Sequence, residues 1–426
     1  MFKTIRDNTT QTLVYLLGII LISLLLKNIF ISISIIVFLS FAFLKIKKGS
    51  FNLKSEFFFP IALYLTMLFS LLWSIDVKSS LFGLQKALPF LVVPLAFVLQ
   101  SELKLSRQSL DKIFKAFSFS VVLFALFFLA RAFLSFVKTK DTALFFYNNL
   151  VPIDPGAVYI SVFCSFALFY FVQITSKSHL DKVALTILTV FLFLLSSKSI
   201  ITIDFLIIVC YYAFFAPIPQ STKFITIVTV TVFLFFSILY VKEVKERFLV
   251  EYETSFVDNT LKSPIDTTNV VVHNVSIGQA WHNKKFKQND FFPGAALRVY
   301  QTRIFAEILK KYPILLTGSG LEASQRYIRE KTKEYNLYYE YGNLNFHNQY
   351  IQTFAELGIF GFLILLLMLF ANIRNAFMNK DFLHIAFAIT MIMLFLSESF
   401  FCRQRGIVFF IILYCLFNSL KSKKEL

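Results

Sequence analysis

The chain has 426 residues, of which 57% are hydrophobic and only 16% are charged. This composition excludes an ordinary soluble enzyme, because average globular domains contain about 25% charged residues. The formal net charge of +17 does not indicate a nucleic-acid partner, since the lysines and arginines lie in short segments between apolar runs, as in the loops of a membrane protein.

Apolar runs recur along the chain, and each is continuously hydrophobic and not alternating. Runs of about 18 apolar residues are long enough to cross a membrane as helices, whereas membrane β-strands would alternate. The sequence therefore predicts an all-α polytopic membrane protein with about 12 transmembrane helices. The expected spans are residues 11–26, 29–45, 57–74, 82–99, 113–136, 157–175, 182–197, 199–217, 222–241, 350–371, 382–400 and 405–420.

The charges in the short loops predict an orientation for these helices. Lys45, Lys47, Lys48 and Lys54 lie together in one loop, whereas the loops of the opposite side hold scattered cations such as Lys27. Cytoplasmic loops carry the excess of lysine and arginine, so we expect both termini in the cytoplasm. We expect no cleavable signal peptide, because the first apolar run lacks a small-residue cleavage site.

This orientation divides the chain into three parts. We predict an N-terminal bundle of about nine helices over 1–241, a large extracytoplasmic loop subdomain over 242–346, and about three helices over 347–426. The middle part is longer than a simple connector requires. Helix-like patterns at 295–311 and 321–336 predict that it is ordered and packs on the outer face of the bundle.

Two arginines of the expected helix 295–311 are candidates for binding an anion. At about 100° per residue, Arg298 and Arg303 point to different sides, so one pocket can use only one of them. Arg298 lies near the helix start, where free N–H groups would assist it, and the guanidinium fork suits a diphosphate. Arg298 is therefore preferred and Arg303 is the second choice.

His347 begins the run HNQYIQTFAELGIFG, where the polar loop meets a hydrophobic helix. Histidine exchanges protons near neutral pH, so His347 is the candidate general base. Asn348 follows as a helix N-cap or orienting group. Gly358 and Gly361 would let another backbone approach this helix closely. A purely interfacial histidine with helix-packing glycines explains the same residues.

Further charged residues are secondary candidates for binding a diphosphate or glycan. Lys198 lies in the polar gap LLSSKSI, and Glu398, Arg403 and Arg405 lie in SESFFCRQRG between the last two expected helices. The four cysteines are far apart and include no CxxC pair, and no carboxylate cluster is visible. We therefore expect no metal and no cofactor.

The motif of His347 and Asn348, nine residues, Gly358, two residues and Gly361 resembles the signature of the O-antigen ligase and polymerase superfamily. Arg298, fifteen residues before Pro313 and the turn LLTGSG, fits the arginine of that family in spacing. Thr302 stands where relatives often have an aromatic residue, and the turn is longer than their common form. These departures leave Arg303 as an alternative.

The resemblance implies a membrane glycosyltransferase that takes a glycan from undecaprenyl diphosphate, without metal and with inversion. Its acceptor would be lipid A-core, or another glycan in a polymerase, or protein serine and threonine in an O-oligosaccharyltransferase. It implies the bacterial inner membrane, with the large loop in the periplasm, and membrane lipids as neighbours. Arg298 would stabilise the departing diphosphate and His347 would deprotonate the acceptor hydroxyl.

Two functions of other classes remain open. A transporter of lipid-linked oligosaccharides would suit about twelve helices with buried cations, but transporters commonly have repeated halves and broken helices at matching positions. No such repeat is visible, and a transporter does not need the long loop. A receptor or scaffold would use Trp281 and the tyrosines around 335–341 as contact residues.

Overall fold

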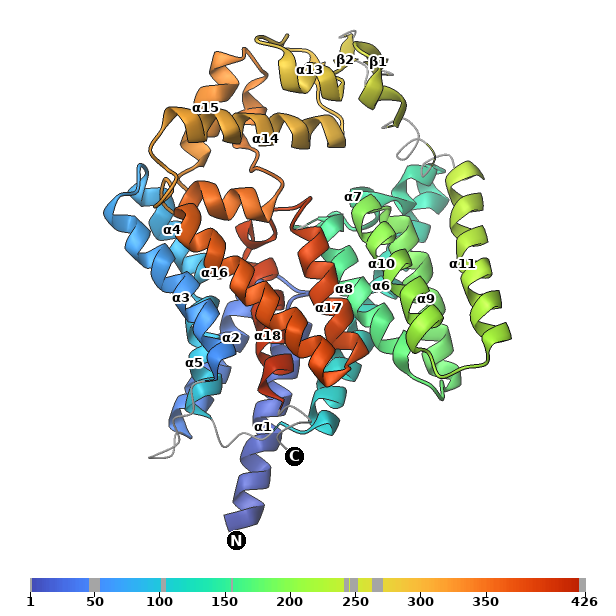
Figure 1. Ribbon diagram of the computed structural model, residues 1–426. Helices are drawn as coiled ribbons and strands as arrows, with labels where there is room; N and C mark the ends of the chain where they lie inside the picture. The colour runs from blue at the N-terminus through green and yellow to red at the C-terminus, as the bar shows by residue number, and fades with distance from the viewer. Residues whose placement is uncertain are drawn as a thin grey trace.

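The structure is a computed structural model that describes residues 2–45, 54–100, 105–154, 156–240, 245, 252–262 and 271–420. It consists of a helical bundle with a smaller part at one end (Figure 1). The N-terminal end of α1 and the C-terminal end of α18 lie at the opposite end of the bundle (Figure 1). Of the loop cations used above for orientation, Lys47 and Lys48 lie outside the described residues.

The bundle contains a helix at each expected span. Its first helices are α1 (Phe2–Ser23), α2 (Asn28–Leu44), α3 (Ser55–Phe69), α4 (Val77–Ala87), α5 (Pro89–Leu99) and α6 (Arg107–Thr139). The next are α7 (Tyr147–Leu150), α8 (Ala157–Gln173), α9 (His179–Leu195), α10 (Lys198–Cys210) and α11 (Gln220–Tyr240). The last are α16 (Gln349–Asn379), α17 (Phe382–Leu394) and α18 (Gln404–Ser419).

The all-α membrane character is confirmed. In the described part of the chain, 5 helical segments are long and apolar enough to cross a membrane, and several other apolar helices are shorter. The number of about twelve crossings therefore stays a prediction. One expected span is divided into α4 and α5, because Pro89 at the start of α5 lacks the N–H that would continue α4.

Helix α18 lies at the centre of the bundle. Every residue from Arg405 to Asn418 is buried, and α18 contacts α5 and also α1, α2, α3, α4 and α16. A helix that is hydrophobic on all sides must be surrounded by protein or lipid, and here protein surrounds it. The connection from α17 to α18 lies at the end of the bundle that faces the smaller part, where Ser397 and Glu398 contact Arg298.

The smaller part has its own hydrophobic core, to which Phe292, Tyr300 and Ile328 contribute. Its helices are α13 (Ile277–His282), α14 (Gly294–Lys311) and α15 (Gln325–Glu334). Strand β2 (Val272–Asn274) pairs antiparallel with β1 (Thr260–Lys262) and parallel with β3 (Asp290–Phe291). We call residues 271–346 the cap. Parts of the predicted subdomain, 242–244, 246–251 and 263–270, lie outside the described residues.

A turn of the cap docks into a break in α16. The turn is residues 315–320, LLTGSG, and the break is at Gly358, whose φ of 65° is left-handed. The Gly320 N–H donates to the Glu356 carbonyl at 2.9 Å, and the Ile359 N–H donates to the Leu315 carbonyl at 2.9 Å. A side chain on Gly358 would meet the Leu316 carbonyl oxygen at 2.2 Å, so only glycine fits here.

Candidate active site

His347 is held in an unusual backbone conformation directly before α16. Its φ is 46°, which is uncommon for a residue other than glycine and costs on the order of 1–3 kcal/mol. The Asn345 side-chain oxygen accepts the His347 N–H at 2.9 Å, and the Asn348 side chain caps α16 by accepting from the Ile351 N–H at 3.0 Å. These two asparagines therefore hold the backbone at His347 and at the start of α16.

The connection between α17 and α18 is bound to the same helix start. The Asn348 N–H donates to the Ser399 hydroxyl at 3.1 Å, and the Asn348 side-chain amide donates to the Leu396 carbonyl at 3.1 Å. The Gln349 N–H donates to the Phe395 carbonyl at 2.8 Å. Residues 395–399 are thus held against His347, and Glu398 is carried with them.

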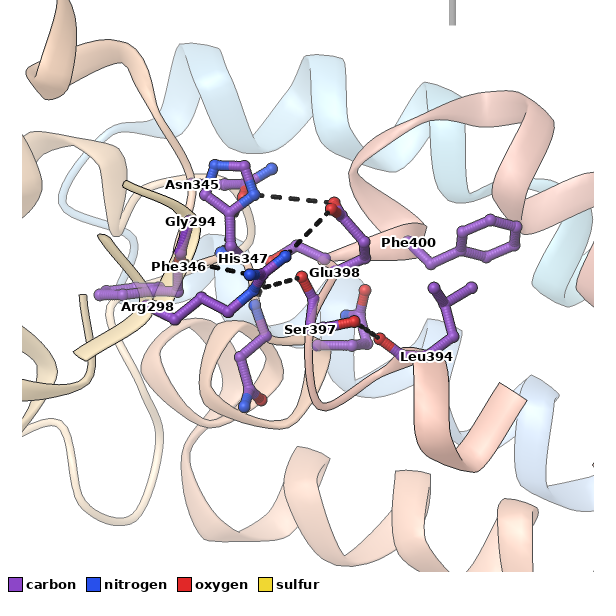
Figure 2. Close-up of polar contacts among 12 residues, drawn as sticks. Gly294, Arg298, Asn345, Phe346, His347, Leu394, Ser397, Glu398 and Phe400 are labelled. Atoms are coloured by element: carbon purple, nitrogen blue, oxygen red, sulfur yellow. Dashed lines mark hydrogen bonds and ion pairs between the residues drawn. The ribbon is translucent and has the colours of Figure 1, made fainter. Parts of the chain in front are cut away.

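Glu398 lies between His347 and Arg298 (Figure 2). Its Oε2 lies 3.6 Å from Nδ1 of His347, and its Oε1 lies 4.0 Å from Nη2 of Arg298. Arg298 also donates from Nε to the Ser397 carbonyl at 3.2 Å and from Nη1 to the Gly294 carbonyl at 3.2 Å. Arg298 comes from α14 of the cap, whereas His347 precedes α16 and Glu398 follows α17. The cap and the bundle therefore meet at this cluster.

The arrangement is suited to moving a proton beside an anion. A carboxylate at Nδ1 of a histidine orients the ring and leaves Nε2 free to take a proton from a hydroxyl. The Arg298 side chain is 37% exposed and that of His347 is 26% exposed, so a ligand can reach both. Among the described residues, no group of three or more histidine, cysteine, aspartate or glutamate side chains is arranged to hold a metal ion.

Arg303 faces the interior of the cap and not this cluster. Its guanidinium bonds Glu307 at 3.0 Å, the Asn283 carbonyl at 2.8 Å and the Tyr335 hydroxyl at 2.9 Å. The side chain also lies over the Tyr335 ring, 4.7 Å from its centre. The two arginines of α14 are therefore separated as the helical spacing predicted, and the contacts of Arg303 join α13, α14 and α15.

Glu398, Arg403 and Arg405 do not form the single cluster that their closeness in sequence suggested. Glu398 turns to His347, whereas Arg403 pairs with Asp154 at 3.5 Å. Arg405 is buried in the bundle, because it is the second residue of the central helix α18. Among these three described residues, only Glu398 belongs to the His347 site.

Lys198 and the two motif glycines lie outside the cluster of Arg298, Glu398 and His347. Lys198 is half-buried at the first turn of α10, and the Arg298–Glu398–His347 cluster does not contain it. Gly358 makes the break that receives the cap turn, and a side chain on Gly361 would meet the Leu357 Cβ at 2.3 Å. The glycines thus shape α16 and fix how the cap sits on it.

Sequence reasoning missed Asn345 and the Ser397 carbonyl. Asn345 could have been noticed, because an asparagine two residues before a histidine can accept its N–H in a turn. Ser397 acts through its backbone carbonyl, so its residue type carries no signal. Glu356, which follows His347 in the motif, points away and accepts from Gln352 at 2.5 Å in the interior.

Comparison with known proteins found a family match that includes part of this site. Residues 183–366 match the family model described as O-antigen ligase. The match includes most of α9, the cap with Arg298, His347, and the first half of α16 with both glycines. Glu398 lies beyond it. A search of curated proteins found no match.

Proposed function

Because residues 183–366 match the O-antigen ligase family, we propose that the chain is a membrane glycosyltransferase of that superfamily. It transfers a glycan from undecaprenyl diphosphate to an acceptor hydroxyl such as that of lipid A-core. The reaction takes place on the periplasmic side of the bacterial inner membrane, with both termini in the cytoplasm. The observation that carries this proposal is the meeting of His347, Glu398 and Arg298 at one end of the bundle.

In the proposed reaction, Nε2 of His347 takes the proton of the acceptor hydroxyl as that oxygen attacks the anomeric carbon. The bond between this carbon and the diphosphate oxygen breaks, and its electron pair leaves with undecaprenyl diphosphate. Attack opposite the leaving group inverts the anomeric configuration. A base of this kind contributes roughly 10²–10⁴-fold to the rate.

The other two members of the cluster act on the charges that develop. Glu398 holds the His347 ring and stabilises the imidazolium, as a carboxylate does for a catalytic histidine. Arg298 receives the negative charge that builds on the diphosphate, and the exposed part of its guanidinium is available for this contact. The interior bonds of Arg303 support Arg298 as the diphosphate ligand.

Transfer by the purified protein tests this function. The full chain would be incubated in EDTA with a defined undecaprenyl-diphosphate glycan and, separately, with lipid A-core, a second lipid-linked repeat unit or a serine-containing peptide. We expect product with one acceptor, and loss of it in His347→Ala and Arg298→Ala. The productive acceptor distinguishes ligase, polymerase and protein O-oligosaccharyltransferase. Equal transfer by His347→Ala and wild type would overturn the base role.

A further inference from the structure

A polar cavity lies beyond the α17–α18 connection and does not include the His347 cluster. Its volume is about 410 Å³, and none of His347, Arg298 or Glu398 lines it. The lining comes from the start of α2, the end of α4 and the start of α18. Its charged lining residues are Lys86, Asp154, Arg403 and Arg405.

Two of these cations already have a carboxylate partner. Lys86 pairs with Glu322 at 2.5 Å, and Arg403 pairs with Asp154 at 3.5 Å. The second pair is exposed, with both side chains at 59%, so water weakens it and an incoming anion can replace Asp154. Arg403 can therefore bind an incoming anion without the loss of a buried contact.

Arg405 is different, because it is a buried cation with neutral partners. Only 5% of the residue is exposed. Its Nε donates to the Asn28 side-chain oxygen at 2.8 Å and its Nη1 donates to the Leu24 carbonyl at 3.3 Å. Within the described chain it makes no ion pair with a carboxylate. Asp154 lines the same cavity and attracts Arg405 electrostatically, but its ion pair is with Arg403. A buried charge without a directly bonded counter-ion is costly, so the cavity beside Arg405 favours an anionic group at hydrogen-bonding distance.

An apolar groove continues from this cavity. It has a volume of about 1040 Å³ and is lined by the end of α1, the start of α2 and one side of α6. Leu26, Leu123 and Phe127 are among its apolar lining residues. The groove and the polar cavity share three lining residues, which are Asn28, Asp154 and Arg405. A charged head and a hydrocarbon chain can therefore be held side by side.

We propose that this composite site binds an anionic lipid whose headgroup carries phosphate. The phosphate binds Arg405 and Arg403 in the polar cavity, and a hydrocarbon chain lies in the groove between α1, α2 and α6. A soluble anion would use only the cavity, whereas a phosphate-bearing lipid uses the cavity and the groove. The site is at the same end of the bundle as Glu398, since one connection, residues 395–403, leads from Glu398 to Arg403.

Lipid retention by the full-length protein, measured by native mass spectrometry, tests this site. The probes are dioleoyl phosphatidic acid and dioleoyl glycerol, which has the same chains without phosphate. We expect wild type to retain phosphatidic acid preferentially, and Arg403→Gln to reduce that retention roughly fivefold. Ser120→Phe, which fills the groove, should also reduce it. Arg131→Gln, an exposed α6 arginine that lines neither space, is the matched control and should change nothing.

Three results would overturn the proposal. One is equal retention of phosphatidic acid and dioleoyl glycerol by wild type. Another is full retention of phosphatidic acid by folded Arg403→Gln and Ser120→Phe, with folding checked by the melting temperature of each variant. The third is a pair of findings: inorganic phosphate displaces phosphatidic acid, and Ser120→Phe retains as much phosphatidic acid as wild type. Together they would show a site for a soluble anion only. These measurements do not depend on glycosyl transfer.

Discussion

The Glu398 carboxylate lies 3.6 Å from Nδ1 of His347, although the whole hairpin of α16 and α17 separates the two residues in sequence. Hydrogen bonds hold the connection that carries Glu398 against the residues that follow His347. Asn348 and Gln349 donate to two backbone carbonyls and to the Ser399 hydroxyl of this connection. The carboxylate that faces His347 thus comes from a residue outside the region that the family match covers.

Glu398→Gln should lower kcat with little change in KM for the glycan donor. Glutamine keeps the size of the side chain but cannot stabilise a protonated His347, so the loss falls on the transition state. We expect a fall of about tenfold to a thousandfold, less than for His347→Ala. Rates of transfer at saturating donor, with the melting temperature as a folding control, measure this. An unchanged kcat would show that Glu398 has no part in orienting His347.

Replacing the two arginines of α14 by glutamine should have different effects, one on donor binding and the other on stability. Arg298→Gln should weaken binding of undecaprenyl diphosphate by about tenfold or more, because a charged hydrogen bond contributes about 1.5–3 kcal/mol, and should leave the melting temperature nearly unchanged. Arg303→Gln should lower the free energy of unfolding of the cap by a similar amount. Product inhibition and thermal unfolding separate the effects. Loss of binding in folded Arg303→Gln alone would reverse the assignment.

The cap should lose stability in acid through Glu307. Burial alone would raise the pKa of Glu307, but hydrogen bonds from Lys331, Tyr335 and Arg303 outweigh this and lower it below its ordinary value of 4.5. Because the folded pKa is the lower one, the stabilisation is present above about pH 4.5 and is lost as the pH falls below that value. Glu307→Gln should remove this part of the acid sensitivity in melting curves recorded between about pH 3 and pH 7. An identical pH dependence in wild type and variant would contradict the expectation.

Gly358→Ala should prevent the cap from docking on α16. The alanine would need a left-handed backbone and would place its Cβ 2.2 Å from the Leu316 carbonyl oxygen, so we expect a loss of at least about 1–3 kcal/mol and low yields of folded protein. Gly18→Ala is the control, since a Cβ there meets nothing within 4 Å and alanine favours helices. Expression and melting temperature would be compared. Equal stability of both variants would show that the break tolerates a side chain.

Much of the helical framework follows from the sequence, because membrane helices need continuous apolar runs whatever their neighbours are. The separation of Arg298 from Arg303 also follows, since it depends only on helical spacing within α14. The pairing of Glu398 with His347 does not follow. It depends on how two connections meet at one end of the bundle, and local sequence does not encode that meeting.

Two other features show the same limit. The motif glycines predicted a close backbone approach, but not that the partner would be the turn 315–320 or that Gly358 would break α16. Closeness in sequence suggested that Glu398, Arg403 and Arg405 act together, yet α18 begins between them and turns the two arginines to other partners. Tertiary contacts decide both cases.

The order in which the segments are synthesised gives the α17–α18 connection a particular significance. Arg298 leaves the ribosome first and His347 second, but the Ser397 carbonyl and the Glu398 carboxylate that contact them are made only after α17. A nascent chain that has inserted α16 therefore has both side chains without the groups that orient them. The geometry of the site thus becomes complete only when the α17–α18 connection has been made and has reached this end of the bundle.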